Sequence, residues 1–326
     1  MIDDKFALVI LNPFARDGAA GKNWEYMATM LHKYDIPFLK IETFPDRRKT
    51  MDTIAQEVES GHYNIVIAIG GDGSLSDVIN GMMLSGLEKK PMLGIIPAGT
   101  ANDIGKSFGI RTPNFSKREL KRCVKTIAKG KPYSLDLMLV NDDIYAADSF
   151  GIGFDPEVLY DRNKTRKERE FFTNGIGSYF PSLVDVAKKY VRPRGTILAD
   201  NGKEQLQCPI FNLVVKGVRI YAGQFVLSDK IKADDGLLDA FVYRDFQSYF
   251  SEMLTDPLKR IMDPWIMDQV VQNSLQFHCR NIAVHLDREV ITQVDGEEYV
   301  FDDHFTIKNI KHAIEILTPK GRQVDI

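Results

Sequence analysis

Four short apolar runs, separated by helix-like stretches, fill the first hundred residues of the chain. The apolar runs cover residues 6–11, 38–41, 65–69 and 92–96, and the helical patterns cover 24–34, 47–60 and 75–83. An apolar run of this length predicts a strand that is buried on both faces. Strands that alternate with helices predict a parallel sheet with right-handed crossovers, and such a sheet binds ligands at the carboxyl ends of its strands.

From about residue 133 the pattern changes to short β-rich runs separated by turn residues. The runs cover residues 133–140, 144–149, 196–199, 206–215, 223–227, 237–243, 282–286, 290–294 and 305–308. Asn201-Gly202 and Asp295-Gly296 are typical of hairpin turns between such runs. We therefore expect an antiparallel sandwich or barrel, interrupted by helices around 157–191 and 246–273, and place the boundary near residue 134.

Length and composition limit the classes of protein that remain. A chain of 326 residues is long enough for two domains. The net charge of −3 excludes a partner that is nucleic acid in bulk. Cys123, Cys208 and Cys279 lie far apart, so the sequence indicates neither a disulfide framework nor a zinc site and fits a reducing cytosol. No run approaches 18 apolar residues, so we expect a soluble protein that at most touches a membrane surface.

A glycine-rich turn, Gly70-Gly71-Asp72-Gly73-Ser74, lies between the apolar run 65–69 and the helical pattern 75–83. Glycines let backbone N–H groups approach a phosphate, and the helix N-terminus adds partial positive charge. A carboxylate beside phosphate oxygens repels them unless a divalent cation lies between, so Asp72 predicts a nucleotide phosphate together with Mg²⁺. The alternative is an ordinary strand-to-helix turn in which Asp72 caps the helix.

A second polar turn, Pro-Ala-Gly-Thr-Ala-Asn-Asp at 97–103, follows the apolar run 92–96. Parallel strands bring both turns to the same edge of the sheet, so we expect Asp72 and Asp103 to face one metal–phosphate cluster. Three further groups could contact phosphate: the Gly99 amide, the Thr100 hydroxyl and the Asn102 side-chain amide. Taken alone, this turn is equally typical of a helix cap.

With these motifs the chain resembles the catalytic domain of diacylglycerol kinases, sphingosine kinases and the soluble bacterial lipid kinases. The matching segments are GGDGS at 70–74, DVING at 77–81, PAGTANDIG at 97–105, DGLLD at 235–239 and VDGE at 294–297, preceded by Asn12-Pro13, Gly18 and Gly21-Lys22. The resemblance implies a nucleotide-binding α/β domain, similar to that of NAD kinases and phosphofructokinases, and a C-terminal β-sandwich lipid or acceptor domain. The implied ranges are 1–134 and 135–313, with 314–326 as a candidate return to the first domain.

The resemblance also implies an activity: ATP- and Mg²⁺-dependent transfer of the γ-phosphoryl group to a lipid hydroxyl, that of diacylglycerol or a related lipid. The implied catalytic residues are Asp72, Asp103, Asp295 as general base and Glu297 beside it. The implied nucleotide contacts are Asn12, Thr43, Gly71, Asp72, Gly73, Ser74, Gly99, Thr100 and Asn102. The implied metal ligands are Asp72 and Asp103 at the phosphates, and Lys232, Asp235 and Leu237 around a separate structural Mg²⁺.

The residues alone leave two of these assignments open. Asp295-Gly296 is better explained as a type I′ hairpin turn, because this dipeptide favours positive φ at both positions. The segment 232–237 fits a solvated turn as well as a metal loop. Both assignments therefore depend on the family order of the motifs.

The chain departs from the family pattern at three places. The departing segments are Phe14-Ala15-Arg16 in the first loop, Asp46-Arg47-Arg48-Lys49 after Thr43, and Lys216-Gly217-Val218 after the apolar run FNLVV. The bases at 47–49 are more typical of a solvated helix start than of phosphate contacts. The third departure lies in the part of the chain that is expected to bind the acceptor. The identity of the acceptor is therefore the feature of the function that the sequence predicts least well.

A basic segment indicates how a lipid could be reached. Residues 161–194 hold nine bases and four acids, interleaved with Phe171-Phe172 and Tyr179-Phe180. Such a segment could bind anionic lipid headgroups while its aromatic rings sit at the interface, although a solvated helical insertion explains it about equally well. Trp265 could line an acyl pocket, but core packing explains it better. The expected enzyme is cytoplasmic and peripheral to an anionic membrane, has no nucleic-acid partner, and is left open as a monomer or homodimer.

Two other functions fit the motifs. A kinase of a soluble acceptor is one, since the GGDG turn also resembles that of NAD kinases and phosphofructokinases. The other is a nucleotide- or lipid-sensing regulator without turnover. Such a regulator would be expected to lose its acids, whereas Asp72, Asp103, Asp295 and Glu297 are all present.

Overall fold

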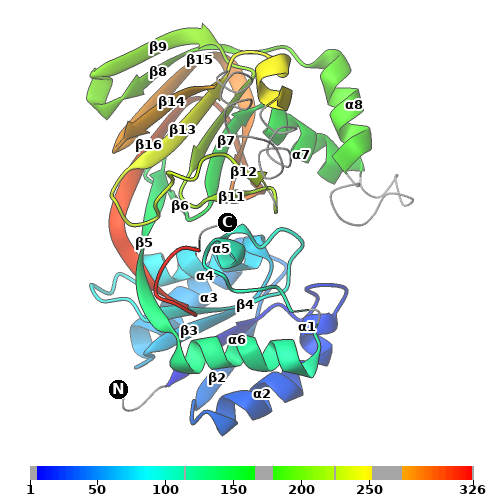
Figure 1. The fold of residues 1–326 in the computed structure, drawn as a ribbon, viewed down its shortest axis with the longest axis vertical. Coiled ribbons are helices and arrows are strands. Elements are labelled where there is room, and N and C mark those ends of the chain that lie inside the picture. Colours follow the sequence, from blue (N-terminus) through cyan, green and yellow to red (C-terminus); the bar gives the residue numbers. More distant parts are fainter. Residues whose placement is uncertain (1–5, 114, 166–178, 224, 252–273, 325–326) are drawn as a thin grey trace, which may run out of the picture.

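Fourteen of the strands in the described residues form one continuous hydrogen-bonded sheet that runs through two structurally different parts, and two short strands pair separately (Figure 1). The structure, a computed structural model, describes residues 6–113, 115–165, 179–223, 225–251 and 274–324. Phe171, Phe172 and Trp265, singled out in the sequence, lie outside these ranges. No helix among the described residues is long and apolar enough to cross a membrane.

Among the described residues, four parallel strands and six helices make up the α/β part, which is the lower half in Figure 1. The strands, in the order β4-β3-β1-β2, are β1 (Ala7–Leu11), β2 (Phe38–Glu42), β3 (Ile65–Gly70) and β4 (Met92–Pro97). The helices are α1 (Ala19–Lys22), α2 (Trp24–Lys33), α3 (Arg47–Ser60), α4 (Asp72–Leu84), α5 (Asp103–Ser107) and α6 (Lys117–Lys129). Every residue of β1 and β3 is buried, as their apolar runs predict.

Helices cover both faces of this parallel sheet. Alternate strand residues, such as Leu8 and Val66, pack against α3, α4 and α5. The residues between them, such as Val9 and Ile67, pack against α1, α2 and α6. Since side chains alternate across a strand, the uninterrupted apolar runs supply both cores.

The helix α6 was missing from the predicted elements, although its signals are present in the sequence. Ser116 accepts a hydrogen bond from the Glu119 backbone N–H and donates one to the Glu119 carboxylate, at 3.4 and 2.8 Å, as in a capping box. Leu120, Val124 and Ile127 then follow at helical spacing and are buried. The missed signal is therefore Ser-x-x-Glu followed by an apolar stripe.

The second part is rich in antiparallel strands and forms the upper half in Figure 1. Its strands are β5 (Lys131–Val140), β6 (Ile144–Ala146), β7 (Ser149–Gly153), β8 (Arg194–Ala199), β9 (Glu204–Pro209), β10 (Asn212–Lys216), β11 (Ile220–Tyr221), β12 (Phe225–Val226), β13 (Leu238–Tyr243), β14 (Leu275–Cys279), β15 (Asn281–Val294) and β16 (Glu297–Thr318). Its helices are α7 (Phe154–Thr165), α8 (Phe180–Lys189) and the short 3₁₀ turn Asp200–Gly202.

The long strand β15 belongs to two groups of strands. Residues 282–286 pair with β8, and residues 292–294 pair with β7, with a register shift against β16 between His285 and Val290. Apolar side chains from both groups, such as Ile197 and Leu213, meet in one core. A second apolar cluster, which includes Phe154 and Val186, lies where α7 and α8 cover β10 and β13.

Several strand predictions were wrong in their limits. The runs 144–149 and 206–215 were each expected to be one strand, but each is divided into two, at 147–148 and at 210–211. The runs 282–286 and 290–294 were expected to be separate, but they are one strand because the chain passes the register shift without a turn.

The strand β16 connects the two parts. It pairs antiparallel with β15 and β5 over most of its length, and Ile316 pairs in parallel with Leu93 of β4. Ile314 and Ile316 are buried in the core of the α/β part. The end of the chain therefore completes the sheet that its first hundred residues begin.

Candidate functional site

The two polar turns predicted from the sequence touch each other at the carboxyl ends of β3 and β4. A Cβ atom at Gly99 would lie 2.6 Å from the Cα of Gly71, so only glycine fits at this contact. The Ala98 N–H donates to the Gly70 carbonyl at 2.6 Å, which fixes the turns side by side. The two polar turns therefore lie together at this edge of the sheet, as the sequence predicted.

Asn12, which follows β1, joins the first turn. Its side-chain amide donates to the Ser74 hydroxyl at 2.9 Å, and its side-chain oxygen accepts from the Phe14 N–H at 3.1 Å. Thr43 lies at the end of the neighbouring strand β2, where its N–H donates to the Leu11 carbonyl at 2.9 Å. The carboxyl ends of β1, β2 and β3 thus bring the predicted nucleotide contacts to one edge.

Asp72 opens α4 and ties the second turn to the first. Its carboxylate accepts hydrogen bonds from the backbone N–H groups of Asn102, at 2.7 Å, and Asp103, at 3.0 Å. Burial and the negative charge of Asp148 raise the Asp72 pKa to about 6. Asp72 is thus the carboxylate around which both turns are organised.

Asn102 holds the shape of the second turn. It has a positive φ of 52°, and its side chain both accepts from the Gly99 N–H, at 2.9 Å, and donates to the Gly99 carbonyl, at 2.7 Å. A further bond runs to the Thr112 hydroxyl at 2.9 Å. The buried Asn102 side chain is therefore engaged within the protein, whereas the neighbouring Thr100 is exposed.

Asp103 reaches across to the β-rich part. Its carboxylate accepts from the Gly223 N–H at 2.7 Å. Burial and the neighbouring carboxylates of Asp148 and Asp72 raise its pKa well above the ordinary value, while the Lys216 ammonium opposes this shift. Asp103 therefore connects the two polar turns to the second part of the molecule.

Asp295 occupies the hairpin turn between β15 and β16. Both Asp295 and Gly296 have positive φ, 50° and 78°, as a type I′ turn requires. The Asp295 carboxylate nevertheless points inward, where it accepts the backbone N–H groups of residues 147, 148 and 149 at 3.1, 2.8 and 3.1 Å. Asp295 therefore forms the predicted hairpin turn while its carboxylate is buried beside residues 147–149.

Asp148, which the sequence did not single out, lies at the electrostatic centre of this site. Its charge contributes to the raised pKa of Asp72, Asp103 and Asp295 alike. We call these four residues the carboxylate cluster. The sequence did contain a signal for Asp148: an acid within the apolar stretch 144–154 is expected to be buried, and a buried acid requires a partner.

The partner of Asp148 is Lys216, at the end of β10. Lys216 is fully buried and donates hydrogen bonds to the Asp148 carboxylate and to the Ile220 carbonyl, the latter at 2.7 Å. Its ammonium nitrogen also lies 5.1 Å from the centre of the Tyr221 ring. The departure at Lys216 noted in the sequence thus places a cation among the four acids.

Glu297 lies against the first turn. A Cβ atom at Gly73 would come within 2.4 Å of the Glu297 carboxylate, so the two residues are in direct proximity. Burial raises the Glu297 pKa, and the positive charge of Arg47 opposes this. Arg47 also donates to the carboxylate of the buried Asp77 at 2.7 Å. The expected helix start at residues 46–49 is therefore observed, and in addition the partly exposed Arg47 guanidinium pairs with a buried acid on α4.

The predicted structural-metal residues lie on a separate loop between β12 and β13. Asp235 is exposed and accepts from the Leu237 N–H at 3.0 Å, while the Leu237 carbonyl accepts from the Asn309 side chain at 3.2 Å. Lys232 is exposed on the same loop. The buried Asp136 of β5 holds this loop by accepting the Gly236 N–H at 2.7 Å.

The carboxylates at the carboxyl ends of β3 and β4 are candidate ligands for Mg²⁺. Within the described ranges, no group of three or more His, Cys, Asp or Glu side chains is arranged to hold a metal ion by itself. Mg²⁺ at phosphates ordinarily uses only one or two carboxylates, with phosphate oxygens and water completing its shell. Burial, and then the negative charge of Asp148, raise the pKa values of Asp72 and Asp103, and a cation beside these carboxylates would offset both effects.

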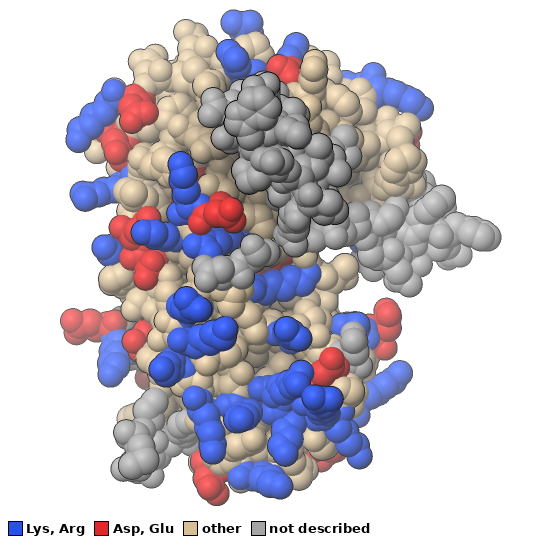
Figure 2. Space-filling model, viewed as in Figure 1, with Lys and Arg blue, Asp and Glu red and all other residues tan. Residues whose placement is uncertain are grey.

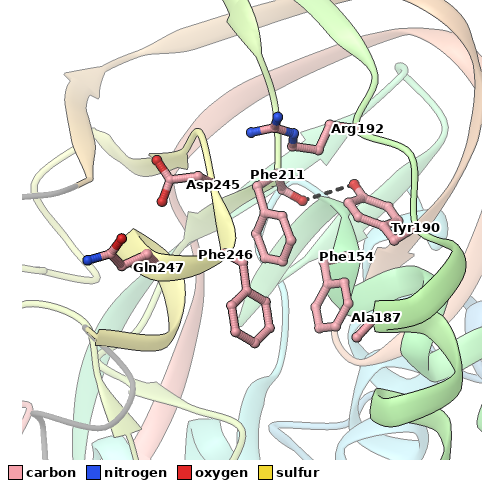
Figure 3. A pocket seen from close by; sticks show the side chains of 8 residues that line it. All are labelled: Phe154, Ala187, Tyr190, Arg192, Phe211, Asp245, Phe246 and Gln247. Atoms are coloured by element: carbon pink, nitrogen blue, oxygen red, sulfur yellow. Dashed lines mark hydrogen bonds between the residues drawn. The ribbon is translucent and has the colours of Figure 1, made fainter.

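A separate aromatic pocket of about 570 Å³ lies in the β-rich part (Figure 3). The rings of Phe154, Phe211 and Phe246 form its apolar wall, and the Phe154 and Phe211 rings stack at 4.9 Å. The remaining lining residues are Ala187, Tyr190, Arg192, Asp245 and Gln247. The Tyr190 hydroxyl donates to the Phe211 carbonyl at 2.9 Å, which joins the end of α8 to this wall.

Glycine-containing turns at the carboxyl ends of parallel strands, each leading into a helix, are typical of sites that bind phosphate groups. The family model described as "Diacylglycerol kinase catalytic domain" matches residues 6–140. A protein of Chromohalobacter salexigens named "Probable lipid kinase YegS-like" is 30% identical over 272 residues, which are 82% of this chain and 80% of that protein. The chain belongs to the diacylglycerol kinase catalytic-domain family.

Other relatives agree with this assignment. A Bacillus subtilis protein named "Diacylglycerol kinase" is 24% identical over 247 residues, 74% of each chain. The crystal structure of a diacylglycerol kinase from Bacillus anthracis superimposes with a TM-score of 0.74 at 19% identity, covering 98% of each chain. That likeness shows a shared fold, a mixed α/β sheet with a β-rich C-terminal region.

Proposed function

We propose that the protein is an ATP- and Mg²⁺-dependent lipid kinase that transfers the γ-phosphoryl group to the hydroxyl of diacylglycerol or a related lipid. The observation that carries the proposal is the carboxylate cluster. It forms where the two polar turns, residues 70–74 and 97–103, approach the β15–β16 hairpin. Phosphoryl transfer requires charge compensation at the phosphates and an oriented hydroxyl, and this arrangement supports both requirements.

The α/β part is proposed to bind the nucleotide. Backbone N–H groups of the turns and the start of α4 would hold phosphate oxygens. The residues proposed as contacts are Asn12, Thr43, Gly71, Gly73, Ser74, Gly99, Thr100 and Asn102. Asp72 and Asp103 would hold Mg²⁺, which when bound supplies the charge compensation.

Asp295 is proposed as the general base, with Glu297 beside it. Burial and the charge of Asp148 raise the Asp295 pKa to about 6, so this carboxyl is mostly ionised at neutral pH yet basic enough to accept a hydroxyl proton. The three backbone N–H groups that bind it fix its orientation. Asp295 can therefore receive the proton of a hydroxyl brought to the cluster.

The aromatic pocket supports a lipid as the acceptor. The strand β7 begins at Ser149, next to Asp148, and Phe154 of the pocket follows its last residue. At about 3.3 Å per residue, its five residues span roughly 16 Å, the reach of a long alkyl chain. One lipid could thus place its hydroxyl at the cluster and an apolar chain at the pocket.

Three further features belong to this proposal. The chain would be organised as a nucleotide-binding domain of NAD kinase- and phosphofructokinase-like fold, residues 1–134 with 314–326, and a lipid domain, residues 135–313. Lys232, Asp235 and Leu237 would hold a second, structural Mg²⁺ through oxygen atoms, as hard cations prefer. The enzyme would act peripherally at a bilayer, since its acceptor is a lipid.

The test is incubation with γ-labelled ATP, Mg²⁺ and mixed micelles of diacylglycerol, ceramide, sphingosine or phosphatidylglycerol, with NAD and sugar phosphates in parallel. Label in the organic phase is expected, and it identifies the lipid. Label only in a water-soluble product would assign a soluble acceptor instead. ATP binding without transfer to any acceptor would favour a sensing role.

A further inference from the structure

The solvent face of α6 concentrates positive charge. Six side chains on this helix are basic and exposed: Lys117, Arg118, Lys121, Arg122, Lys125 and Lys129. The helix has one acid, Glu119, so it carries a net charge of +5. Because the whole chain carries −3, the remaining residues carry −8. A net charge of +5 is thus concentrated on a helix of 13 residues in a protein that is acidic as a whole.

The orientation of this basic face is fixed by packing. Leu120, Val124 and Ile127, on the opposite side of α6, are buried in the core beneath the parallel sheet. Near the two ends of α6, the ammonium groups of Lys117 and Lys129 lie 5.8 and 5.9 Å from the ring centres of Tyr26, in α2, and Tyr34, just after it. Figure 2 shows Lys and Arg side chains gathered over the lower half of the molecule, where α6 crosses the front in Figure 1.

We propose that the basic face of α6 docks the protein on a bilayer of anionic lipids, an inference that rests on the proposed lipid kinase function. A helix of this length presents its charges along roughly 20 Å in one plane, which suits a flat anionic surface. Salt screens charges beyond about 10 Å, so the acidic remainder of the protein on other faces opposes docking only weakly.

The structure favours α6 over the basic segment 161–194 considered in the sequence. In the described part of that segment, Lys189 pairs with Asp161 at 3.4 Å and Arg192 donates to the Arg244 carbonyl at 2.8 Å. Arg162 lies 4.3 Å from the centre of the Tyr179 ring. These bases contact partners within the protein, as Lys117 and Lys129 of α6 also do, whereas Lys121, Arg122 and Lys125 form an exposed row along the middle of α6.

The test compares two triple variants that each remove three exposed positive charges. K121Q/R122Q/K125Q alters α6, and K164Q/K188Q/K189Q is the matched control in the other segment. Vesicle co-sedimentation is measured without ATP, on phosphatidylglycerol–phosphatidylcholine vesicles and on phosphatidylcholine vesicles. At about fivefold per basic residue, the α6 variant should bind anionic vesicles roughly a hundredfold more weakly, with little change in the control.

Two results would overturn the proposal: unchanged binding by the α6 variant, or an equal loss in the control. Tighter binding of the parent protein to double-stranded DNA than to the anionic vesicles, at equal salt, would overturn the choice of a membrane. Sedimentation does not depend on catalysis, so it decides docking even if no lipid is phosphorylated. Lipid kinase activity in neutral micelles should be unchanged in the α6 variant, and an equal loss there and on vesicles would also overturn the proposal.

Discussion

The ammonium group of Lys216 donates a hydrogen bond to the carboxylate of Asp148 inside the protein, across 68 positions of sequence. Both side chains are almost entirely buried, and Asp148 influences three further acids. The loop that carries Asp148 also supplies the backbone N–H groups that hold Asp295. Lys216 is therefore connected to Asp295 through this loop.

Removing one member of this ion pair should cost more than removing both. Lys216→Met leaves Asp148 buried without its cation, which should lower the free energy of unfolding by about 3–5 kcal/mol. In D148N/K216M both charges are absent, so more than half of that loss should be recovered. Urea unfolding of the parent, both single variants and the double variant measures this coupling. Additive losses in the double variant would contradict a coupled pair.

Kinase activity should depend on the ionisation of Asp295. Its pKa is raised to about 6, first by burial and then by the charge of Asp148, and only the ionised form accepts a proton. We expect kcat to rise with pH through about 6 and then level off. In Asp148→Asn a neighbouring negative charge is lost, so the rise should move to lower pH. A profile that stays in place in this variant would exclude Asp295 as the titrating group.

Two glycine substitutions should separate the shape of the turns from the role of Glu297. Gly99→Ala places a methyl group 2.6 Å from the Gly71 backbone, so the two turns must move apart and activity should be lost. Gly73→Ala meets only the flexible end of Glu297, at 2.4 Å, so the fold should remain while kcat/KM falls.

The double variant G73A/E297A serves as the control for the second substitution. It frees the space that the methyl group needs, but it also lacks the Glu297 carboxylate. If displacement of Glu297 explains the defect, G73A/E297A should be no more active than E297A alone. Steady-state kinetics with ATP and diacylglycerol micelles would measure this, and wild-type activity in G73A would contradict the proximity of the two residues.

The partly buried carboxylate of Asp155 should contribute strongly to the stability of the fold. It accepts hydrogen bonds from the hydroxyls of Tyr221 and Tyr249 and from the Asn212 side chain. Tyr249→Phe leaves this acid with one donor fewer and should cost about 1.5–3 kcal/mol. Tyr299→Phe is the matched control, because its hydroxyl bonds the exposed Asp143, and it should cost under about 1 kcal/mol. Equal thermal shifts in the two variants would contradict this view.

Local patterns predicted most of the α/β part. The apolar run 65–69 and the glycines at 70–73 correctly placed a buried strand and a turn at its carboxyl end, because these features depend on neighbouring residues. The helix α3 begins and ends at the residues that its pattern indicated, since Asp46 caps its first turn and Gly61 follows its last residue. Such signals act within a few positions of the sequence.

The centre of the site could not be predicted in the same way. Asp148 and Lys216 are each single polar residues next to apolar strands, and only the pairing of β7 with β10 brings them together. The surroundings of the Asp295 carboxylate could not be predicted either. The Asp-Gly pair predicts the turn locally, but the three hydrogen-bond donors to the carboxylate come from residues 147–149, far away in the sequence. Contacts that depend on the order of strands in a sheet join residues far apart in the sequence, so they leave no local sequence pattern.

The 22-residue strand β16 has a consequence for how the chain can fold during synthesis. Leu93 of β4 is made early, but its partner Ile316 emerges from the ribosome more than two hundred residues later. Until then one edge of the parallel sheet is uncovered, and Ile314 and Ile316 are missing from its core. The first part of the protein to be translated is therefore among the last to be finished, which ties its maturation to completion of the whole chain.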